Sequence, residues 1–298
     1  MFAFVTSDRF ARLDSKDRDR LEALAKLDEF SVGQQISASG TPMEWLYLIA
    51  SGGVDLRAKT HSGEVTLCEL GPGDIFGEME SFCELPPGVR HVARKETIVR
   101  AVPKNPLKQE LKAHRSLASG LLTVYCRSIS EKLRATNEVA VRMGSGGGAS
   151  HPPPPAAPGS PRASHLSYEE AAWLALLGQR MVVAAGEIVV SEGESSRAFY
   201  VVEHGELEVR KGKVGQPEQT LARLGERDLF GFMSFVDGKP RSASVVSLGE
   251  SQLARIEPDA LDKALHLNFT VSFKFLGTIC GVLGRTYRET AQKIITSS

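Results

Sequence analysis

Short apolar runs separated by glycine-bearing turns dominate the chain. Residues 45–49 and 199–202 are runs of aromatic and branched side chains, and each is followed by a turn that contains glycine. Residues 206–210 alternate between charged and apolar positions, which is the period of a strand buried on one face. Further strands are predicted at 242–246 and 253–256. Many short strands joined by glycine turns predict a barrel or a jelly roll.

Helical periodicity brackets these strands. Residues 17–27 place Leu21, Leu24 and Leu27 on one helical face, and another apolar stripe follows the first group of strands. After the second group, apolar residues from Phe269 to Ile294 recur three and four positions apart, which is a heptad seam. This last helix either packs on its own barrel or forms a homodimer interface, and the pattern leaves both alternatives open.

The two halves of the chain repeat each other. Tyr47 and Tyr200 are 153 positions apart, while residues 70–77 match residues 224–231 at an offset of 154. One residue has therefore been gained in a loop between these points. A duplicated supersecondary unit is a stronger signal than any single motif.

Glycine and proline mark the boundary between the halves. Residues 144–161 hold no large apolar side chain, so they cannot bury enough surface to offset the entropy of ordering. We expect a first domain at 1–143, a flexible linker at 144–165 and a second domain with the last helix at 166–298. The linker is interpreted as a spacer, with a docking site for a proline-reading domain as the alternative.

Charge and composition narrow the class of protein. The chain has 298 residues, with 36 Lys and Arg against 36 Asp and Glu. A formal net charge of zero argues against a protein that coats nucleic acid, because such a protein needs a surplus of basic residues. No apolar run reaches the ~18 residues of a membrane span, and the N-terminus lacks a signal-peptide pattern. Four cysteines without metal spacing indicate reduced thiols, so we expect a cytoplasmic protein with neither membrane nor nucleic acid as a partner.

The ordered glycines and aromatic residues of the repeat resemble a known family. Gly33-x-x-Ile36-x-x-x-Gly40, then Tyr47-aliphatic-aliphatic-x-x-Gly52, then Gly-Asp-aliphatic-Phe-Gly at 73–77 are similar to the cyclic nucleotide-binding domain. The resemblance covers about residues 10–140 and 166–295. It implies a mainly β fold with flanking helices, in which two β-roll domains are joined by the linker.

That family has a phosphate-binding cassette, and the resemblance assigns candidate residues to it. In the family, a glutamate after Phe-Gly accepts a hydrogen bond from the ribose 2′-hydroxyl, and an arginine after proline pairs with the cyclic phosphate. The first half matches the glycine, the glutamate and the following aliphatic residue with Gly77, Glu78 and Met79. Arg90, followed by His91, is the expected match of the arginine. The alternatives are that Glu78 caps a short helix and that Arg90 is a solvated loop charge.

The second half keeps the other part of the cassette. Gly231 is followed by Phe232 where the family has glutamate, while Arg241, Ser242 and Ala243 keep the family's order after proline. The first half therefore keeps the ribose acceptor and the second keeps the phosphate clamp. We expect the second barrel, expressed alone, to bind cAMP or cGMP more weakly than the first. The alternative for the second-half arginine is a structural ion pair with a nearby carboxylate.

These expectations define a function. We expect a non-enzymatic cyclic-nucleotide receptor, with cAMP or cGMP as ligand, that signals its occupancy to an unidentified protein partner through its helices. The alternative is a degenerate pair of barrels that serves as a protein-interaction scaffold. No catalytic residue, metal site or cofactor is expected, because the sequence lacks a His-x-His pair and any nucleophile–base motif.

Overall fold

The computed structural model describes residues 3–4, 6–37, 41, 43–144, 166–212, 218–261 and 269–297. The chain forms two compact units: Met1–Val139 together with Ser272–Ser298, and Ala140–Val271. The predicted linker at 144–165 lies outside the described residues except for Gly144.

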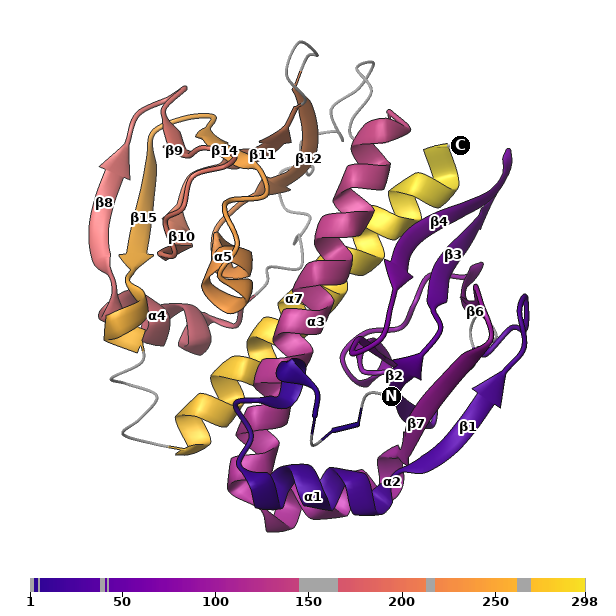
Figure 1. The fold of residues 1–298 in the computed structure, drawn as a ribbon. Helices are drawn as coiled ribbons and strands as arrows, with labels where there is room; N and C mark the ends of the chain where they lie inside the picture. The colour runs from indigo at the N-terminus through magenta and orange to yellow at the C-terminus, as the bar shows by residue number, and fades with distance from the viewer. Residues whose placement is uncertain are drawn as a thin grey trace. The chain divides into compact units, whose positions relative to one another are not determined.

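The first unit holds two antiparallel sheets with helices at their ends (Figure 1). One sheet has the order β1-β7-β2-β5 and the other the order β4-β3-β6. The strands are β1 (Lys26–Phe30), β2 (Trp45–Ser51), β3 (Val54–Thr60), β4 (Gly63–Leu70), β5 (Ile75–Phe76), β6 (Val89–Ala93) and β7 (Thr97–Pro103). The helical segments are η1 (Asp8–Phe10), α1 (Ser15–Leu24), η2 (Met79–Ser81), α2 (Lys104–Ala113) and α3 (Arg115–Arg142).

The second unit repeats this arrangement. Its sheets have the orders β13-β10-β15-β8 and β12-β11-β14-β9. The strands are β8 (Gln179–Val183), β9 (Ile188–Val190), β10 (Phe199–His204), β11 (Leu207–Lys211), β12 (Gln219–Leu224), β13 (Leu229–Phe230), β14 (Ser244–Ser247) and β15 (Ser251–Ile256). The described helices are α4 (Tyr168–Leu177) and α5 (Phe232–Asp237). The predicted pair of mainly β domains with flanking helices is confirmed.

Equivalent aromatic pairs occupy the two cores. The Tyr47 ring stacks on Phe76 with centroids 4.6 Å apart, and the Tyr200 ring stacks on Phe230 at 4.7 Å. These four side chains come from the paired strands β2·β5 and β10·β13. Each stacked pair therefore packs the strand that leads into the cassette against the centre of its sheet.

The first predicted helix is shorter than its pattern. The Asp14 side chain caps α1 by accepting a hydrogen bond from the Asp17 amide at 2.7 Å, and Leu21 is fully buried. The helix ends at Leu24 because Ala25 adopts an extended conformation and β1 then pairs with β7. Leu27 lies on that strand and is 55 % exposed, so its assignment to the helical face was wrong.

The last helix, α7 (Phe269–Ser297), belongs from Ser272 onward to the first unit. Cys280, Leu283, Tyr287 and Ile294 of its seam are fully buried. The expected assignment of this helix to the 166–298 domain therefore differs from the grouping in the structure. The reason is that α7 contacts α3 of the first unit: Cys280 Sγ lies 3.0 Å from Cys126 Sγ and 3.7 Å from the Leu122 carbonyl oxygen.

Candidate functional site

A glycine in a left-handed conformation begins each cassette. Gly77 has φ +91°, and a Cβ atom built on it would lie 2.3 Å from the Trp45 carbonyl oxygen. Gly231 has φ +80° and precedes α5. Only glycine fits these positions without strain, so both halves keep the turn that positions the next residue.

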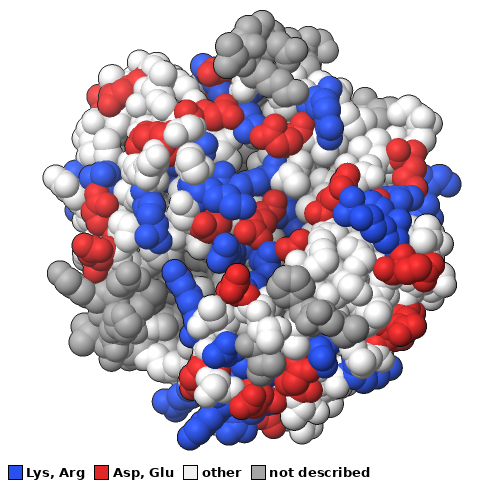
Figure 2. Space-filling model, in the orientation of Figure 1, with Lys and Arg blue, Asp and Glu red and all other residues white. Residues whose placement is uncertain are grey.

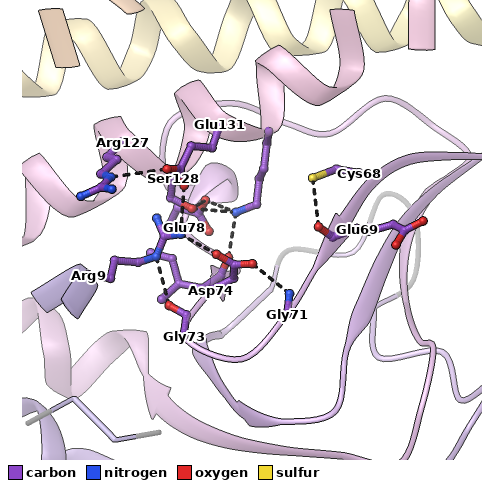
Figure 3. Close-up of polar contacts among 12 residues, drawn as sticks. Arg9, Cys68, Glu69, Gly71, Gly73, Asp74, Glu78, Arg127, Ser128 and Glu131 are labelled. Carbon is purple, nitrogen blue, oxygen red and sulfur yellow. Dashed lines mark hydrogen bonds and ion pairs between the residues drawn. The ribbon is translucent and has the colours of Figure 1, made fainter. Parts of the chain in front are cut away.

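Glu78 lies inside the first unit and is held by α3. Its side chain is fully buried, and its Oε1 atom accepts hydrogen bonds from the Lys132 ammonium and, at 2.9 Å, from the Ser128 hydroxyl. Figure 3 shows Glu78 and Ser128 facing each other across the cassette and the helix. The alternative in which Glu78 caps the short helix η2 is not supported, because its side chain makes no capping hydrogen bond.

Lys132 is a residue of the candidate site that the sequence analysis missed. Its ammonium donates to the Ile75 carbonyl oxygen at 2.8 Å, to Ser128 Oγ at 3.0 Å and to Glu78. The side chain is 1 % exposed. Ser128 and Lys132, four positions apart beside the apolar stripe of this helix, were the available signal, since such residues share one face.

A second polar contact joins the same turn to α3. Arg9 pairs with Asp74 at 2.5 Å and with Glu131 at 2.9 Å, and its Nε atom donates to the Gly73 carbonyl oxygen at 3.0 Å (Figure 3). Asp74 also accepts from the Gly71 amide at 2.8 Å. The cassette turn, the N-terminal segment and α3 are thus joined by ionic contacts on both sides of β5.

The strand register corrects one expected correspondence. Strand β6 pairs with β3 so that Ala93 lies opposite Val54, and β14 pairs with β11 so that Ser247 lies opposite Leu207. The offset is 153 between β3 and β11 but 154 between β6 and β14 and between the cassette glycines, so Pro87 aligns with Arg241. By the same register Arg90 aligns with Ser244 of the second unit.

The structure places Arg90 and His91 on opposite faces of β6. The Arg90 guanidinium, 41 % exposed, pairs with Glu64 and donates to Gln35 Oε1 at 3.2 Å. Arg90 is partly exposed, but it lies on strand β6 in an ion pair and is not the solvated loop charge of the alternative.

His91 points into the barrel instead. It is fully buried, its Nδ1 atom lies 2.9 Å from Ser37 Oγ, and its ring stacks on Phe76 with centroids 5.0 Å apart. Burial, with the nearby charges of Lys132 and Lys104, lowers the pKa of His91 to about 3. The imidazole is therefore neutral at physiological pH and packs as part of the core.

In the second unit, Arg241 binds the cassette backbone. It is 4 % exposed and donates to the Gly231 carbonyl oxygen at 2.8 Å, to the Ala198 carbonyl oxygen at 2.6 Å and to Ser196 Oγ at 3.1 Å. The guanidinium is thus directed at the start of α5. Phe232, the residue after the glycine, is 5 % exposed and adds an apolar side chain where the first unit has a carboxylate.

The remaining candidates lie close by. Met79, which follows Glu78 in the first cassette, is 1 % exposed. Ser242 Oγ lies 3.6 Å from Met233 Sδ, and the Ser242 carbonyl oxygen accepts from Lys211 at 2.7 Å. Ala243 is buried and directly precedes β14. The structure brings Gly231, Arg241 and Ser242 together, whereas in the first unit Glu78 and Arg90 have separate polar partners.

The described residues form neither a candidate metal site nor a helix that could cross a membrane. No group of three or more His, Cys, Asp or Glu side chains there has an arrangement that could hold a metal ion. None of the described helices combines the length and apolar character needed to cross a bilayer. Basic and acidic side chains are interspersed on the face that Figure 2 shows.

Comparison with known proteins supports the resemblance. A family model described as the cyclic nucleotide-binding domain matches residues 27–114 and 180–268. A curated relative, the cAMP-dependent protein kinase regulatory subunit of Eremothecium gossypii, is 25 % identical over 256 residues, which is 86 % of this chain and 47 % of the relative. The same subunit from Blastocladiella emersonii is 20 % identical over 86 % of this chain and 56 % of its own length.

Two further similarities cover different extents. The cyclic AMP receptor protein of Thermus thermophilus is 35 % identical over 95 residues, which is 32 % of this chain and 44 % of that protein. Among solved structures, the regulatory domain of Toxoplasma gondii PKA with cAMP is 18 % identical, covers 90 % of both chains and has a TM-score of 0.32. The chain spans about half the length of the kinase regulatory subunits that it matches along most of its sequence.

Proposed function

The chain belongs to the cyclic nucleotide-binding domain family and holds two copies of the domain in tandem, and on that premise we propose that it is a non-enzymatic cyclic-nucleotide receptor. The ligand is cAMP or cGMP, and occupancy is transmitted to a protein partner through the helices that follow the barrels. Because the curated relatives are regulatory subunits of a cAMP-dependent protein kinase, the catalytic subunit of such a kinase is the first partner to test. A cytoplasmic location is part of this proposal.

The observation that carries the proposal is the position of Arg241. Its guanidinium lies against the left-handed Gly231 and donates to two carbonyl oxygens and a hydroxyl, which supports its assignment as the clamp that would pair with the cyclic phosphate. A charged donor that is already oriented loses little side-chain entropy when it binds an anion. We therefore assign phosphate binding to the second barrel.

The first barrel is the weaker candidate once the register is known. Pro87 at the clamp position has no cation to offer, and Glu78 is bonded to Lys132. The Oε2 atom of this carboxylate has no hydrogen-bond partner but is buried with the rest of the side chain, so a ribose hydroxyl could reach it only after the cassette opens. We accordingly reverse the order of affinity expected from the sequence and assign tighter binding to the second barrel.

Calorimetric titration of the full chain with cAMP, cGMP and, as a control, the linear 5′-monophosphates tests this function. We expect one binding event that Arg241→Lys weakens at least tenfold, because a lysine cannot reproduce the forked geometry of the guanidinium. The matched control is Arg90→Lys, which should leave affinity unchanged. Heat from neither cyclic nucleotide, with the protein folded, would contradict the proposal.

The alternative function, a protein-interaction scaffold, draws on the first barrel. The buried Glu78–Lys132 pair joins the cassette to α3 without a ligand. A barrel whose cassette is held against α3 by this ion pair presents a fixed surface to a partner protein. Partner binding that is indifferent to cyclic nucleotide would favour the scaffold over the receptor.

A further inference from the structure

A pocket outside the nucleotide cassettes opens beside η2 in the first unit. It has a volume of about 450 Å³ and is bounded by η2, α2, α3 and the start of α7. This volume falls within the range of small-molecule sites, roughly 300–1,000 Å³. The pocket does not include Glu78 or the strands of the barrel interior.

The floor of the pocket is apolar and aromatic. Ala118, Leu121, Leu122 and Tyr125 of α3 are buried along it, and Leu107 of α2 completes it. The Phe82 ring forms one wall and meets Tyr125 edge to face, with centroids 6.0 Å apart. A flat apolar ligand would gain both area burial and ring contacts here.

Three charged side chains line the same pocket. Glu80 comes from η2, and Lys104 and Lys108 come from α2. The Oε2 atom of Glu80 is buried and has no hydrogen-bond partner, which marks an acceptor left open for a donor. Burial raises the pKa of Glu80 and lowers the pKa of Lys104, so both groups lie in a partly desolvated setting.

We propose that this pocket binds a small aromatic anion that also carries an N–H or O–H donor. The ring lies on the floor formed by α3, the anionic group pairs with Lys104 and Lys108, and the donor bonds to Glu80 Oε2. Apolar walls with a few convergent polar groups are the usual composition of a ligand site. The buried acceptor gives specificity, because leaving it unpaired carries a desolvation cost that a matching donor removes.

The pocket is also connected to the first cassette through η2 and α3. Glu80 follows Glu78 by two residues in the same short helical turn, and Ala118, Tyr125 and Lys132 lie on the same α3. A ligand in the pocket therefore contacts both elements that the Glu78–Lys132 pair joins. None of the contacts proposed for this ligand involves a cyclic nucleotide, so the test below is made without nucleotide and does not depend on the proposed receptor function.

The probe is 1-anilinonaphthalene-8-sulfonate, which combines fused rings, an N–H donor and a sulfonate. Fluorescence titration of the full chain without nucleotide should give one site per chain. Ala118→Phe, which fills the floor, should weaken the affinity at least tenfold, and Lys104→Met about fivefold. Lys112→Met is the matched control, since this exposed lysine lies on α2 outside the pocket, and it should leave the affinity unchanged.

A second comparison isolates Glu80. Naphthalene-1-sulfonate lacks the N–H donor and should bind the native protein several-fold more weakly than the anilino probe. The two probes should bind Glu80→Gln with a smaller difference. If Ala118→Phe does not fold, as judged by thermal melting, Lys104→Met and the probe comparison decide the question. Native-like affinity in Lys104→Met, or equal affinity of the two probes for the native chain, would overturn the proposal.

Discussion

Cys126 and Cys280 lie with their Sγ atoms 3.0 Å apart although 154 residues separate them. This separation is the offset that relates the two cassettes, so the two thiols occupy equivalent positions on the equivalent helices α3 and α7. The contacts that each thiol makes with the opposite helix show the same offset. Cys126 Sγ lies 3.4 Å from the Leu276 carbonyl oxygen, and Cys280 Sγ lies 3.7 Å from the Leu122 carbonyl oxygen. The two copies of one helix thus contact each other through equivalent residues.

This pairing predicts a monomer. The seam of α7 that could hold a second copy is buried within the chain at Cys280, Leu283 and Tyr287. Light scattering coupled to size exclusion should therefore give the mass of one chain at micromolar concentration. A mass of two chains that Leu283→Asp converts to one would instead support the homodimer through α7.

The buried ion pair predicts a large and compensable loss of stability. Lys132→Met should lower the free energy of unfolding by about 3–5 kcal/mol, because Glu78 would remain buried without its cation. The double variant Glu78→Gln with Lys132→Met should recover most of that loss. Urea unfolding of the three proteins measures both effects, and a double variant as unstable as Lys132→Met alone would contradict this account.

His91 predicts a pH dependence of a definite sign. Its pKa is lowered to about 3 in the folded protein, against about 6.5 in an unfolded chain. Between these values the unfolded state binds more protons, so the contribution of this group to stability is present above pH 6.5 and is lost as pH falls. At about 1.4 kcal/mol per pH unit, the loss between pH 6.5 and 5 is about 2 kcal/mol.

Urea unfolding at pH 7, 6 and 5 measures this loss, and His91→Gln separates it from other titrating groups. The variant should be less stable at pH 7, because it loses the ring stacking on Phe76, but its stability should change less with pH. Parallel pH profiles for the native protein and the variant would exclude His91 as the source.

Gly231 and Gly225 form a matched pair for testing the second cassette. A Cβ atom on Gly231 would lie 2.6 Å from Arg241 Nη1 and 3.0 Å from the Ala198 carbonyl oxygen, in a backbone conformation that side chains rarely adopt. Gly231→Ala should therefore cost about 1–3 kcal/mol of stability and displace the guanidinium. Gly225→Ala, with nothing within 4 Å of its Cβ, should be nearly neutral, and equal melting temperatures for both variants would contradict the argument.

The sequence by itself determined the repeat, the strands and the cassette glycines. Tyr47 and Tyr200 mark equivalent strands, and Gly77 and Gly231 mark turns that only glycine fits, because these requirements are local to a few neighbouring residues. The apolar stripes of both long helices were visible for the same reason. Short-range periodicity is enough to reveal an element and its buried face.

Only the tertiary structure decided which side chains meet. The register of β6 against β3 aligned Pro87 with Arg241 and paired Arg90 with Glu64. The sequence did not reveal this register, because strand pairing depends on residues far apart in the chain. The bond between Glu78 and Lys132 joins positions 54 residues apart. The choice of partner for α7 also rested on long-range packing, since an apolar seam specifies that a helix is covered but not which surface covers it.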